Sequence, residues 1–418
     1  MVDVPNATIV PARPVRTRFA VAAGQVASRA SRLLGRGHGA VIGGRVALKL
    51  DPGTLRRLTA GRPVTIVTGT NGKTTTTRLV AEALGVARSV SSNRGANMPP
   101  GLVDASASDA DELVFEVDEL WVPSVAAQVH PVVLVLLNLS RDQLDRITEV
   151  RRIADLWRDL IGAATWPMTV VANVDDPLVV WAVGDHEDVV WVAAGSRWRE
   201  DAALCPSCSR VREVADDGRW SCECGLSRPE PQWWVDGDVL HRSDGLAMAL
   251  QLALPGDFNR ANSAVAVAVA AARGVDPHAA LVPVQQVADV SGRYVTTDLA
   301  GRRLRLLMGK NPASWTETMH LIDDTASAVA ICLNARGADG RDTSWIWDVP
   351  FELLAGRTVV ASGDRRLDLS VRLDVAGVAH TVVADLVESV DALPVGPVDV
   401  VATYTAFHDL LEGLHVHW

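Results

Sequence analysis

Lysine is nearly absent from this 418-residue chain, which has only Lys49, Lys73 and Lys310 and takes its other positive charge from arginine. A position that keeps lysine here is expected to need an ammonium group, because the two cations bind differently. Long apolar runs are also absent, since the longest, around 131–139, is well short of the roughly 18 residues of a membrane span. No segment has the charged start and apolar core typical of a signal peptide. We therefore expect a cytoplasmic protein.

Negative charge dominates the chain as a whole but not its beginning. The formal net charge is −10, which disfavours a generic nucleic-acid-binding protein, because such a protein needs a field that attracts phosphates. Residues 1–62 nevertheless contain ten arginines and one lysine against Asp3 and Asp51, a charge of +9 that leaves −19 for the rest. This basic segment requires an explanation of its own.

Hydrophobic residues make up 48% of the chain, enough for two or three domains of about 100–200 residues, each with its own core. Apolar, β-rich runs alternate with helical stretches, which indicates βαβ units and a largely parallel sheet. We place a domain boundary near residue 295. The expected strands are 64–67, 113–117, 132–137, 169–172, 303–308, 328–333, 358–361, 380–384 and 398–403, and 257–274 is expected to be a long helix.

The basic segment contains a predicted amphipathic helix. Apolar residues recur at helical spacing, and arginines lie off that stripe. The stripe consists of Phe19, Ala23, Val26, Ala30 and Leu33. Two interpretations remain open: residues 13–36 bring the protein to an anionic membrane surface, or they form a solvated basic arm packed on the rest of the chain.

A glycine-rich loop follows the first predicted strand of the α/β region. Its sequence, Gly69-Thr70-Asn71-Gly72-Lys73-Thr74-Thr75, leads into a helical pattern over 78–84. Strand, loop and helix N-terminus together form an anion site in which backbone N–H groups face phosphates, Lys73 adds a charge and the Thr74 hydroxyl can ligate Mg²⁺. The loop is shorter than the usual G-x-x-x-x-G-K-[ST] form, and a chance turn is the weaker alternative.

Four of the five cysteines lie close together in the segment 199–230. They form the pairs Cys205/Cys208 and Cys222/Cys224, which are separated by 13 residues. In a chain without an export signal this spacing favours a structural Cys₄ zinc ribbon over disulfides. The fifth, Cys332, lies inside an apolar run and is expected in a core.

The loop sequence GTNGKTT resembles that of the Mur ligases and folylpolyglutamate synthases. Later segments follow in the order of that superfamily, namely Glu116, Asn138–Arg146, Asn173–Pro177, Gly256–Asn262 and Gly292-Arg293. Lys310-Asn311-Pro312 and Asn334–Asp348 are similar, more specifically, to the ligase subunits of lipid II isoglutaminyl synthases. The resemblance extends from about residue 40 to the C-terminus.

The resemblance implies a Mur ligase-type ATP-binding domain over 56–294 that carries the zinc-ribbon insert. A basic arm and helix (1–55) would precede it, and a smaller α/β ligase domain (295–418) would follow. ATP would be bound by the loop residues 69–75 together with Asn138, Asp176, Asn259, Asn262 and Arg293. Thr74 and Glu116 would hold Mg²⁺, and Lys73 and Glu116 would act in catalysis.

The implied reaction is amidation of the α-carboxylate of D-isoglutamate in the lipid II stem peptide. ATP would convert the carboxylate to an acyl phosphate, and ammonia would displace the phosphate to give D-isoglutamine. Gln143 replaces the histidine that amino-acid-adding relatives use for a second Mg²⁺, and no lysine occurs between Lys73 and Lys310, so a second metal is in question. Only 68 residues precede Gly69, too few for an added domain that binds a UDP-sugar.

The source of ammonia is not evident in the chain, because no segment resembles the turn that carries a glutaminase cysteine. The resemblance implies a partner, a class I glutamine amidotransferase of the GatD type, whose histidine would be completed by Asp348. An alternative is that Asp348 caps a helix beginning at Val349-Pro350. Two other functions remain alternatives: a stand-alone Mur or folylpolyglutamate-type amino-acid ligase, and a zinc-containing regulatory module that uses ATP as a switch.

Overall fold

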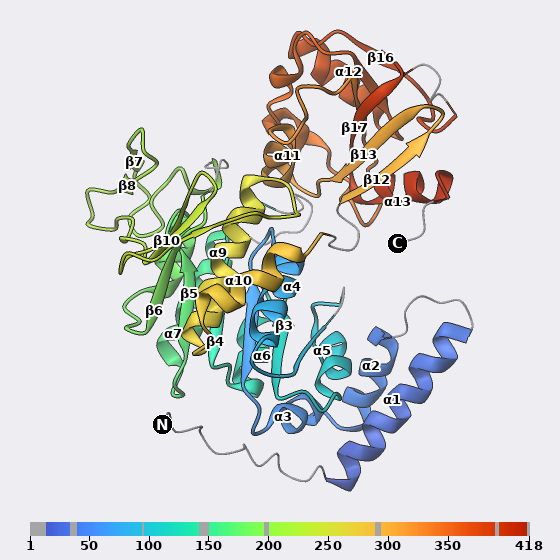
Figure 1. Ribbon diagram of the computed structural model, residues 1–418. Coiled ribbons are helices and arrows are strands. Elements are labelled where there is room, and N and C mark those ends of the chain that lie inside the picture. The colour runs from blue at the N-terminus through green and yellow to red at the C-terminus, as the bar shows by residue number, and fades with distance from the viewer. Residues whose placement is uncertain are drawn as a thin grey trace. The chain divides into compact units, whose positions relative to one another are not determined.

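The computed structural model describes residues 14–33, 40–93, 96–141, 150–195, 200–288, 294–388 and 393–415. The chain divides into two compact units. Among the described residues the first runs to Val287, apart from Ser140, Arg141, Glu200 and Asp201, which group with the second unit from Ala288 onward. Each unit is built on one main sheet with helices around it (Figure 1). The α/β class expected from the sequence is confirmed.

The first unit contains a nine-stranded sheet. In spatial order its strands are β11 (Ala247–Ala249), β10 (Val239–Arg242), β9 (Trp233–Asp236), β6 (Val189–Ala193), β5 (Thr169–Asn173), β4 (Val133–Leu136), β1 (Val64–Thr68), β3 (Glu112–Glu116) and β2 (Val90–Ser92). The strands from β9 to β2 are parallel, and β10 and β11 are antiparallel additions. Strands β1, β3 and β4 are buried along their whole length, as expected for the centre of a parallel sheet.

Helices cover this sheet and continue beyond one of its sides. They are α1 (Val15–Leu33), α2 (Ala40–Leu50), α3 (Thr54–Thr59), α4 (Lys73–Gly85), α5 (Pro99–Ser106), α6 (Val122–Val129), α7 (Val150–Ala163), α8 (Pro177–Val183), α9 (Asp257–Ala272) and α10 (Pro277–Gln286). The Ala/Val-rich helix α9 packs against α4, so the loop helix has a rigid neighbour. None of the described helices could serve as a membrane span.

The cysteine segment is inserted between β6 and β9. It contains a short 3-10 helix, η1 (Glu200–Ala202), and a two-stranded sheet of β7 (Glu213–Val214) and β8 (Trp220–Ser221). The polar and charged sequence leaves few apolar side chains for a core here, although Cys205, Trp220 and Cys222 are buried.

The second unit contains a six-stranded sheet. In spatial order its strands are β12 (Tyr294–Leu299), β13 (Arg302–Met308), β17 (Gly396–Ala402), β14 (Ala328–Cys332), β15 (Val359–Ser362) and β16 (His380–Val382). All neighbours are parallel except β12 and β13. The helical elements are α11 (Pro312–Met319), η2 (Ser344–Asp348), η3 (Phe351–Leu354), α12 (Arg366–Val375) and α13 (Tyr404–Gly413). Cys332 is 3% exposed within β14, which confirms it as a core residue.

The two faces of the second sheet carry different helices. One core contains Trp315 of α11, Phe351 of η3 and Leu369 of α12, whereas the other contains Phe407 of α13. Strands β14 and β17 are neighbours in the sheet. The chain therefore leaves them toward opposite faces of that sheet. In open parallel sheets such a switch point creates a crevice at the carboxyl ends of the strands.

Candidate active site

The glycine-rich loop connects β1 to α4, and its two glycines adopt conformations that other residues avoid. Gly69 has a φ of 139° and Gly72 a φ of 84°. A Cβ at Gly69 would lie 2.9 Å from the backbone N of Asn138, and one at Gly72 would lie 2.9 Å from Oδ1 of Asn262. The loop is therefore enclosed by Asn138 on one side and by Asn262 on the other.

Asn138 fixes the loop through three of its atoms. Its carbonyl oxygen accepts a hydrogen bond from the Thr70 N–H at 2.9 Å. Its side-chain Oδ1 accepts from the Asn71 N–H at 2.8 Å, and its Nδ2 donates to the Asn71 carbonyl at 3.0 Å. Helix α4 begins at Lys73 without a side-chain cap, so its first N–H groups remain directed toward the loop. This arrangement suits the oxygens of a phosphate chain.

Lys73 is buried inside this loop. Its Nζ donates to the carbonyl oxygens of Gly69 at 2.6 Å and Thr70 at 3.2 Å, and it forms an ion pair with Glu119 Oε2 at 3.2 Å. Burial raises the pKa of Glu119 above its usual value, although the ammonium of Lys73 opposes this shift. The Trp157 indole donates to the Glu119 carbonyl at 3.0 Å and so holds the turn that carries this carboxylate.

The sequence interpretation did not identify Glu119. The only local hint is that Glu116, Asp118 and Glu119 place three carboxylates within four positions. The pairing with Lys73, 46 residues away, depends on the turn after β3 and could not be inferred from spacing. Glu119 is therefore an addition to the predicted site.

Glu116 ends β3 beside the loop strand. Its backbone pairs in register with Val67, two residues before Gly69, and Asn93 holds its N–H at 2.8 Å and its carbonyl at 2.9 Å. The carboxylate is 5% exposed at the residue level, and Thr74 lies in the first turn of α4. Carboxylate and hydroxyl oxygens are ligands that Mg²⁺ accepts, so Thr74 and Glu116 fit the predicted magnesium pair.

Asp176 lies behind the loop, not in it. Its Oδ1 caps α8 by accepting from the N–H groups of Leu178 at 2.9 Å and Val179 at 3.4 Å, and its Oδ2 accepts from Leu139 at 2.7 Å. Burial raises the pKa of this carboxyl to about 6, even though the three amide donors lower it. Asp176 thus supports the segment that carries Asn138, and its contact with ATP stays a prediction.

Two further residues predicted to bind ATP, Asn259 and Asn262, lie on α9. Asn262 faces Gly72, and its Nδ2 donates to Asn259 Oδ1 at 3.4 Å. The Nδ2 of Asn259 donates to the Pro255 carbonyl at 2.6 Å, so this side chain closes the start of the helix. Arg293 and Gln143 lie outside the described residues.

The four cysteine sulfurs converge on one point. All four Sγ atoms lie within 4.8 Å of one another, with 3.6 Å between Cys205 and Cys224 and 3.4 Å between Cys208 and Cys222. Tetrahedral Zn²⁺ with Zn–S bonds of about 2.3 Å would separate sulfurs by about 3.8 Å. The cluster therefore fits a closed zinc site without an open position.

Both cysteine pairs lie in tight turns. The Cys205 N–H donates to the Arg210 carbonyl at 2.7 Å, and the Cys222 N–H donates to the Leu226 carbonyl at 2.9 Å. The second turn is one residue shorter, in keeping with its C-x-C spacing, and Gly225 has a φ of 95° there. A left-handed glycine makes the shorter turn possible.

The insert is anchored to the segment that supports the loop. The Trp220 indole donates to the Val174 carbonyl at 3.1 Å, and Arg228 forms an ion pair with Asp175 at 2.8 Å. Val174 and Asp175 immediately precede Asp176, whose carboxylate holds the segment carrying Asn138. A continuous set of contacts thus runs from the cysteine insert to the phosphate loop.

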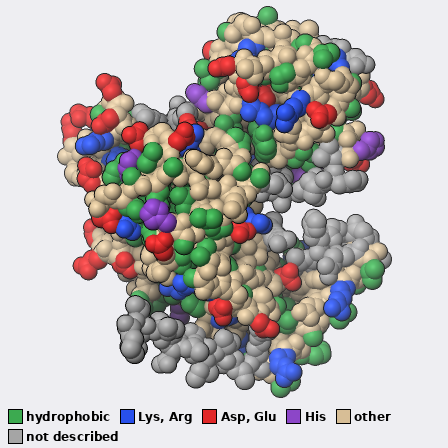
Figure 2. All heavy atoms as spheres, in the orientation of Figure 1, with side chains coloured by type: hydrophobic (Ala, Val, Ile, Leu, Met, Phe, Trp, Pro, Cys, Tyr) green, Lys and Arg blue, Asp and Glu red, His purple; other side chains and the backbone are tan. Residues whose placement is uncertain are grey.

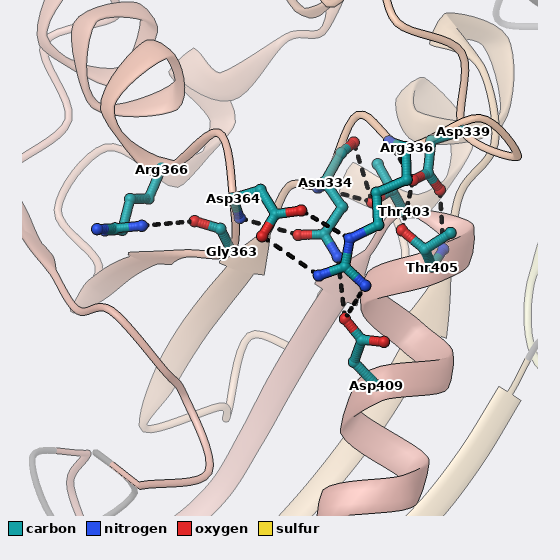
Figure 3. A network of polar contacts seen from close by, with 9 residues as sticks. All are labelled: Asn334, Arg336, Asp339, Gly363, Asp364, Arg366, Thr403, Thr405 and Asp409. Carbon is teal, nitrogen blue, oxygen red and sulfur yellow. Dashed lines mark hydrogen bonds and ion pairs between the residues drawn. The ribbon is translucent and has the colours of Figure 1, made fainter.

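A second group of polar residues lies at the carboxyl ends of the parallel strands of the second unit. Figure 3 shows Arg336 reaching between Asp364 and Asp409. Its guanidinium lies 2.7 Å from Asp364 Oδ2 and 2.8 Å from Asp409 Oδ2. The Asn334 side chain contacts Asp409 at 3.2 Å and accepts from the Asp364 N–H at 2.9 Å. The network fixes the beginning of the segment that leads to Asp348.

Asp348 lies at the end of η2, where 38% of its side chain is exposed. Its carboxylate forms an ion pair with Arg141 at 3.3 Å. The N-cap position of η3 is Pro350, so the alternative that Asp348 caps a helix beginning at Val349 is wrong. The short 3-10 helix η3, which begins at Phe351, stands in place of the expected helix.

Comparisons with known proteins agree on one family. A family model described as Mur ligase middle domain matches residues 67–270, and one described as MurT ligase C-terminal matches residues 308–407. The chain is 27% identical over 401 residues to the lipid II isoglutaminyl synthase (glutamine-hydrolyzing) subunit MurT of Staphylococcus aureus (strain N315), covering 89% of this chain and 90% of that protein. It is 28% identical over 437 aligned positions to the subunit of the same name from Streptococcus pneumoniae (strain ATCC BAA-255 / R6), covering 94% and 96%.

Solved structures share the fold. A pseudomurein peptide ligase type C from Methanothermus fervidus superposes with a TM-score of 0.67 at 17% identity, covering 87% of this chain and 80% of that one. MurF ligase from Thermotoga maritima in complex with ADP superposes with a TM-score of 0.61 at 18% identity, covering 89% and 83%. At such identities the likeness concerns the fold alone.

The two family matches lie one after the other along the chain, with the phosphate loop at the start of the first. The chain therefore belongs to the Mur ligases, ATP-dependent enzymes that form carbon–nitrogen bonds. The match to its second unit and the two relatives above specify the branch. Within the Mur ligases this is a MurT-type chain, as the resemblance of its motifs predicted. Membership implies ATP and Mg²⁺, which the loop, Thr74 and Glu116 could accommodate.

Proposed function

We propose that this chain is the ligase subunit of a lipid II isoglutaminyl synthase. It would amidate the α-carboxylate of D-isoglutamate in the lipid II stem peptide to D-isoglutamine. The observation that carries the proposal is the similarity to two MurT subunits over 89% and 94% of the chain, combined with the C-terminal match over residues 308–407. The C-terminal match includes Asp348, Arg336 and Asp364.

The proposed chemistry has two steps. A carboxylate oxygen of the substrate attacks the γ-phosphorus of ATP, and the bond to the bridging oxygen breaks to release ADP. The nitrogen of ammonia then attacks the acyl carbon, phosphate leaves with the electrons of the carbon–oxygen bond, and the nitrogen loses a proton. Activation is needed because a free carboxylate has a poor leaving group.

The residues of the loop supply the electrostatic part of this chemistry. Backbone N–H groups at the start of α4 bind phosphate oxygens, and the Lys73 ammonium stabilises the charge on the transferring phosphoryl group. Mg²⁺, when bound, would neutralise further phosphate charge, with Thr74 and Glu116 as its protein ligands. To act in this way Lys73 must give up at least one of its contacts with Gly69, Thr70 and Glu119, because an ammonium has three donor hydrogens.

A second protein would supply ammonia. Cys332, the one cysteine outside the cluster, is a poor nucleophile because burial raises the pKa of its thiol to about 12. A GatD-type glutaminase is the proposed partner, and Asp348 would orient and stabilise its histidine. The half-exposed carboxylate supports this role, as does the exposure of Trp347 and Leu353 next to it. Uncovered aromatic and aliphatic side chains beside a functional carboxylate are typical of an interface.

The proposed site of action is the cytoplasm, with peripheral contact at the inner membrane leaflet, because the substrate is carried by a lipid. The basic N-terminal segment supports this location, since cytoplasmic leaflets are anionic.

The test compares nucleophiles on one substrate. The purified chain is incubated with lipid II, ATP and either ammonium, glutamine with a candidate glutaminase, or single amino acids. We expect ADP release together with the mass change for replacing a hydroxyl by an amino group, with ammonium alone or with glutamine plus the partner. Addition of an amino acid instead would support the stand-alone amino-acid ligase and contradict the proposal.

A further inference from the structure

Helix α1 turns its small residues toward the protein. Thr17 and Ala20 are fully buried, and Gly24 lies against Gly43 of α2. A Cβ on either glycine would lie 2.6 Å from the carbonyl oxygen of the other, so the two helices are in close contact. The orientation of α1 about its own axis is therefore fixed by a face that only small side chains can form.

The large apolar residues of α1 lie on the opposite face and are exposed. Val15 is 81% exposed, Phe19 65%, Val26 66% and Leu33 89%. Their spacing of four, seven and seven residues places them on one side of a helix with 3.6 residues per turn. We call these four residues the outer stripe. A helix that packs on a core would bury such a stripe. Because the outer stripe is exposed, we expect another molecule to bind it.

The charges beside the outer stripe are all positive. Arg18 and Arg29 lie along one edge of it on the helical wheel, and both are exposed. Arg45 and Lys49 of the neighbouring α2 are exposed as well. From residue 4 to residue 50 the sequence contains seven arginines, one lysine and no acidic residue. In Figure 2 the outer edge formed by α1 shows hydrophobic and basic side chains next to one another.

The combination of exposed apolar side chains and positive charge decides which kind of molecule can bind the outer stripe. A second copy docked by the same face would bring arginines together with no acidic residue in the segment to compensate. Nucleic acid would match the charge but not the exposed phenylalanine and aliphatic groups. A bilayer surface matches both, because apolar side chains enter the boundary below the headgroups while arginines remain among anionic phosphates.

We propose that the outer stripe of α1, with its flanking arginines, is the surface by which this chain binds an anionic membrane. The inference rests on the proposed function in one respect, namely that a lipid-carried substrate gives such binding a purpose. Helix α1 would lie in the plane of the interface, and the close α1–α2 contact would connect it to the first unit.

The test uses the full chain and lipid vesicles without substrate. Vesicles of equimolar phosphatidylcholine and phosphatidylglycerol are compared with vesicles of phosphatidylcholine alone in sedimentation at low salt. The variant Phe19→Asp/Val26→Asp disrupts the outer stripe. Its matched control, Val371→Asp/Val375→Asp, places the same charges on exposed positions of α12, which are 56% and 66% exposed. Thermal unfolding verifies that both variants fold.

We expect the wild-type chain and the α12 control to bind anionic vesicles equally, and the α1 variant to bind roughly tenfold more weakly. Binding should fall with added salt and on neutral vesicles. The proposal is overturned if the wild-type chain does not bind anionic vesicles, or if the α1 variant binds as well as the control. A concentration-dependent dimer that the α1 variant abolishes, without vesicle binding, would instead identify a second copy as the occupant.

Failure of this inference can be separated from failure of the proposed function. Amidation of a water-soluble stem-peptide substrate reports on the ligase reaction without a membrane, and the α1 variant should retain it in full. Loss of vesicle binding with intact amidation supports both proposals. Intact vesicle binding without amidation in the wild-type chain would contradict the proposed function alone.

Discussion

The Lys73 ammonium lies 3.2 Å from the Glu119 carboxylate inside the phosphate loop, where both side chains are almost fully buried. The ammonium also donates hydrogen bonds to the carbonyl oxygens of Gly69 and Thr70. Polyphosphate must replace at least part of this set, because one ammonium has three donor hydrogens. Glu119 thus competes with the nucleotide for Lys73.

Replacing Glu119 by glutamine should tighten the binding of magnesium-free ADP. The change removes a negative charge next to the phosphate position and releases Lys73, and we expect about a tenfold lower Kd, or ~1.4 kcal/mol. Calorimetric titration in the presence of a chelator measures this directly. Glu116→Gln is the matched control and should change the effect of Mg²⁺ but not the magnesium-free Kd. Weaker binding by Glu119→Gln would show that this carboxylate is not a competitor.

Asp176 should make stability depend on pH between about 4 and 6. Its pKa is raised from 3.8 to about 6 in the folded chain, so the folded state keeps the proton over a range in which the unfolded state loses it. The resulting stabilisation is complete below pH 3.8 and disappears as the pH rises through about 6. Relative to Asp176→Asn, the wild-type chain should lose about 3 kcal/mol of unfolding free energy across this range. A difference that stays constant in denaturant titrations at several pH values would contradict the assignment.

The anchoring of the cysteine insert can be tested with two arginines. Arg228 pairs with Asp175 in a largely buried position, with 14% and 16% of the side chains exposed, whereas Arg210 pairs with Glu223 at the surface, with 67% and 74% exposed. Arg228→Ala should lower the unfolding free energy by about 1–3 kcal/mol and weaken nucleotide binding, because it loosens the segment behind Asn138. Arg210→Ala should change neither quantity. Equal effects of the two substitutions would refute a specific anchoring role.

Removal of zinc should weaken the same contacts that anchor the cysteine insert to the segment behind Asn138. Cys222→Ser leaves three thiolates, and we expect loss of bound zinc, measured by elemental analysis, together with faster proteolysis between residues 200 and 230. Cys332→Ser is the control, since this residue lies in β14 and contacts no metal ligand. Unchanged zinc content in Cys222→Ser would exclude the four-cysteine site.

Asp348→Asn should separate the two sources of ammonia. Glutamine-dependent amidation in the complex should fall on the order of 10³-fold, because the neutral amide cannot stabilise a protonated histidine of the partner. Ammonium-dependent amidation by the chain alone should be unchanged. Asp342→Asn is the nearby control, since Asp342 is also exposed and accepts from the Ser344 N–H at 2.8 Å. Full glutamine-dependent activity of Asp348→Asn would reject the assignment.

Local patterns predicted four of the nine strands in the first sheet and five of the six in the second. Continuous apolar runs such as Val64–Thr68 and Ala328–Cys332 are typical of buried parallel strands, and the glycine loop is defined by its own residues. The antiparallel additions were missed for a physical reason. Strands β10 and β11 are short, β10 ends at the charged Arg242, and the Gly237-Asp238 turn before β10 gives a weaker signal than an apolar run.

The side of α1 that packs could not be predicted from periodicity. Its large apolar residues recur at helical spacing, and so do Ala20 and Gly24 on the other side. Helical spacing does not distinguish a face that packs on protein from one that remains exposed. The close approach of Gly24 to Gly43 decides this, and it involves a partner helix that the local pattern does not contain.

The central claim is that the loop around Lys73 directs ATP to the activation of a carboxylate. The most direct measurement compares Lys73→Ala with the wild-type chain in lipid II amidation with ammonium, with ADP and amide quantified in the same sample. We expect equal amounts of ADP and amide from the wild-type chain and a loss of both, on the order of 10²-fold or more, in the variant. Amide formation by Lys73→Ala at the wild-type rate would contradict the account.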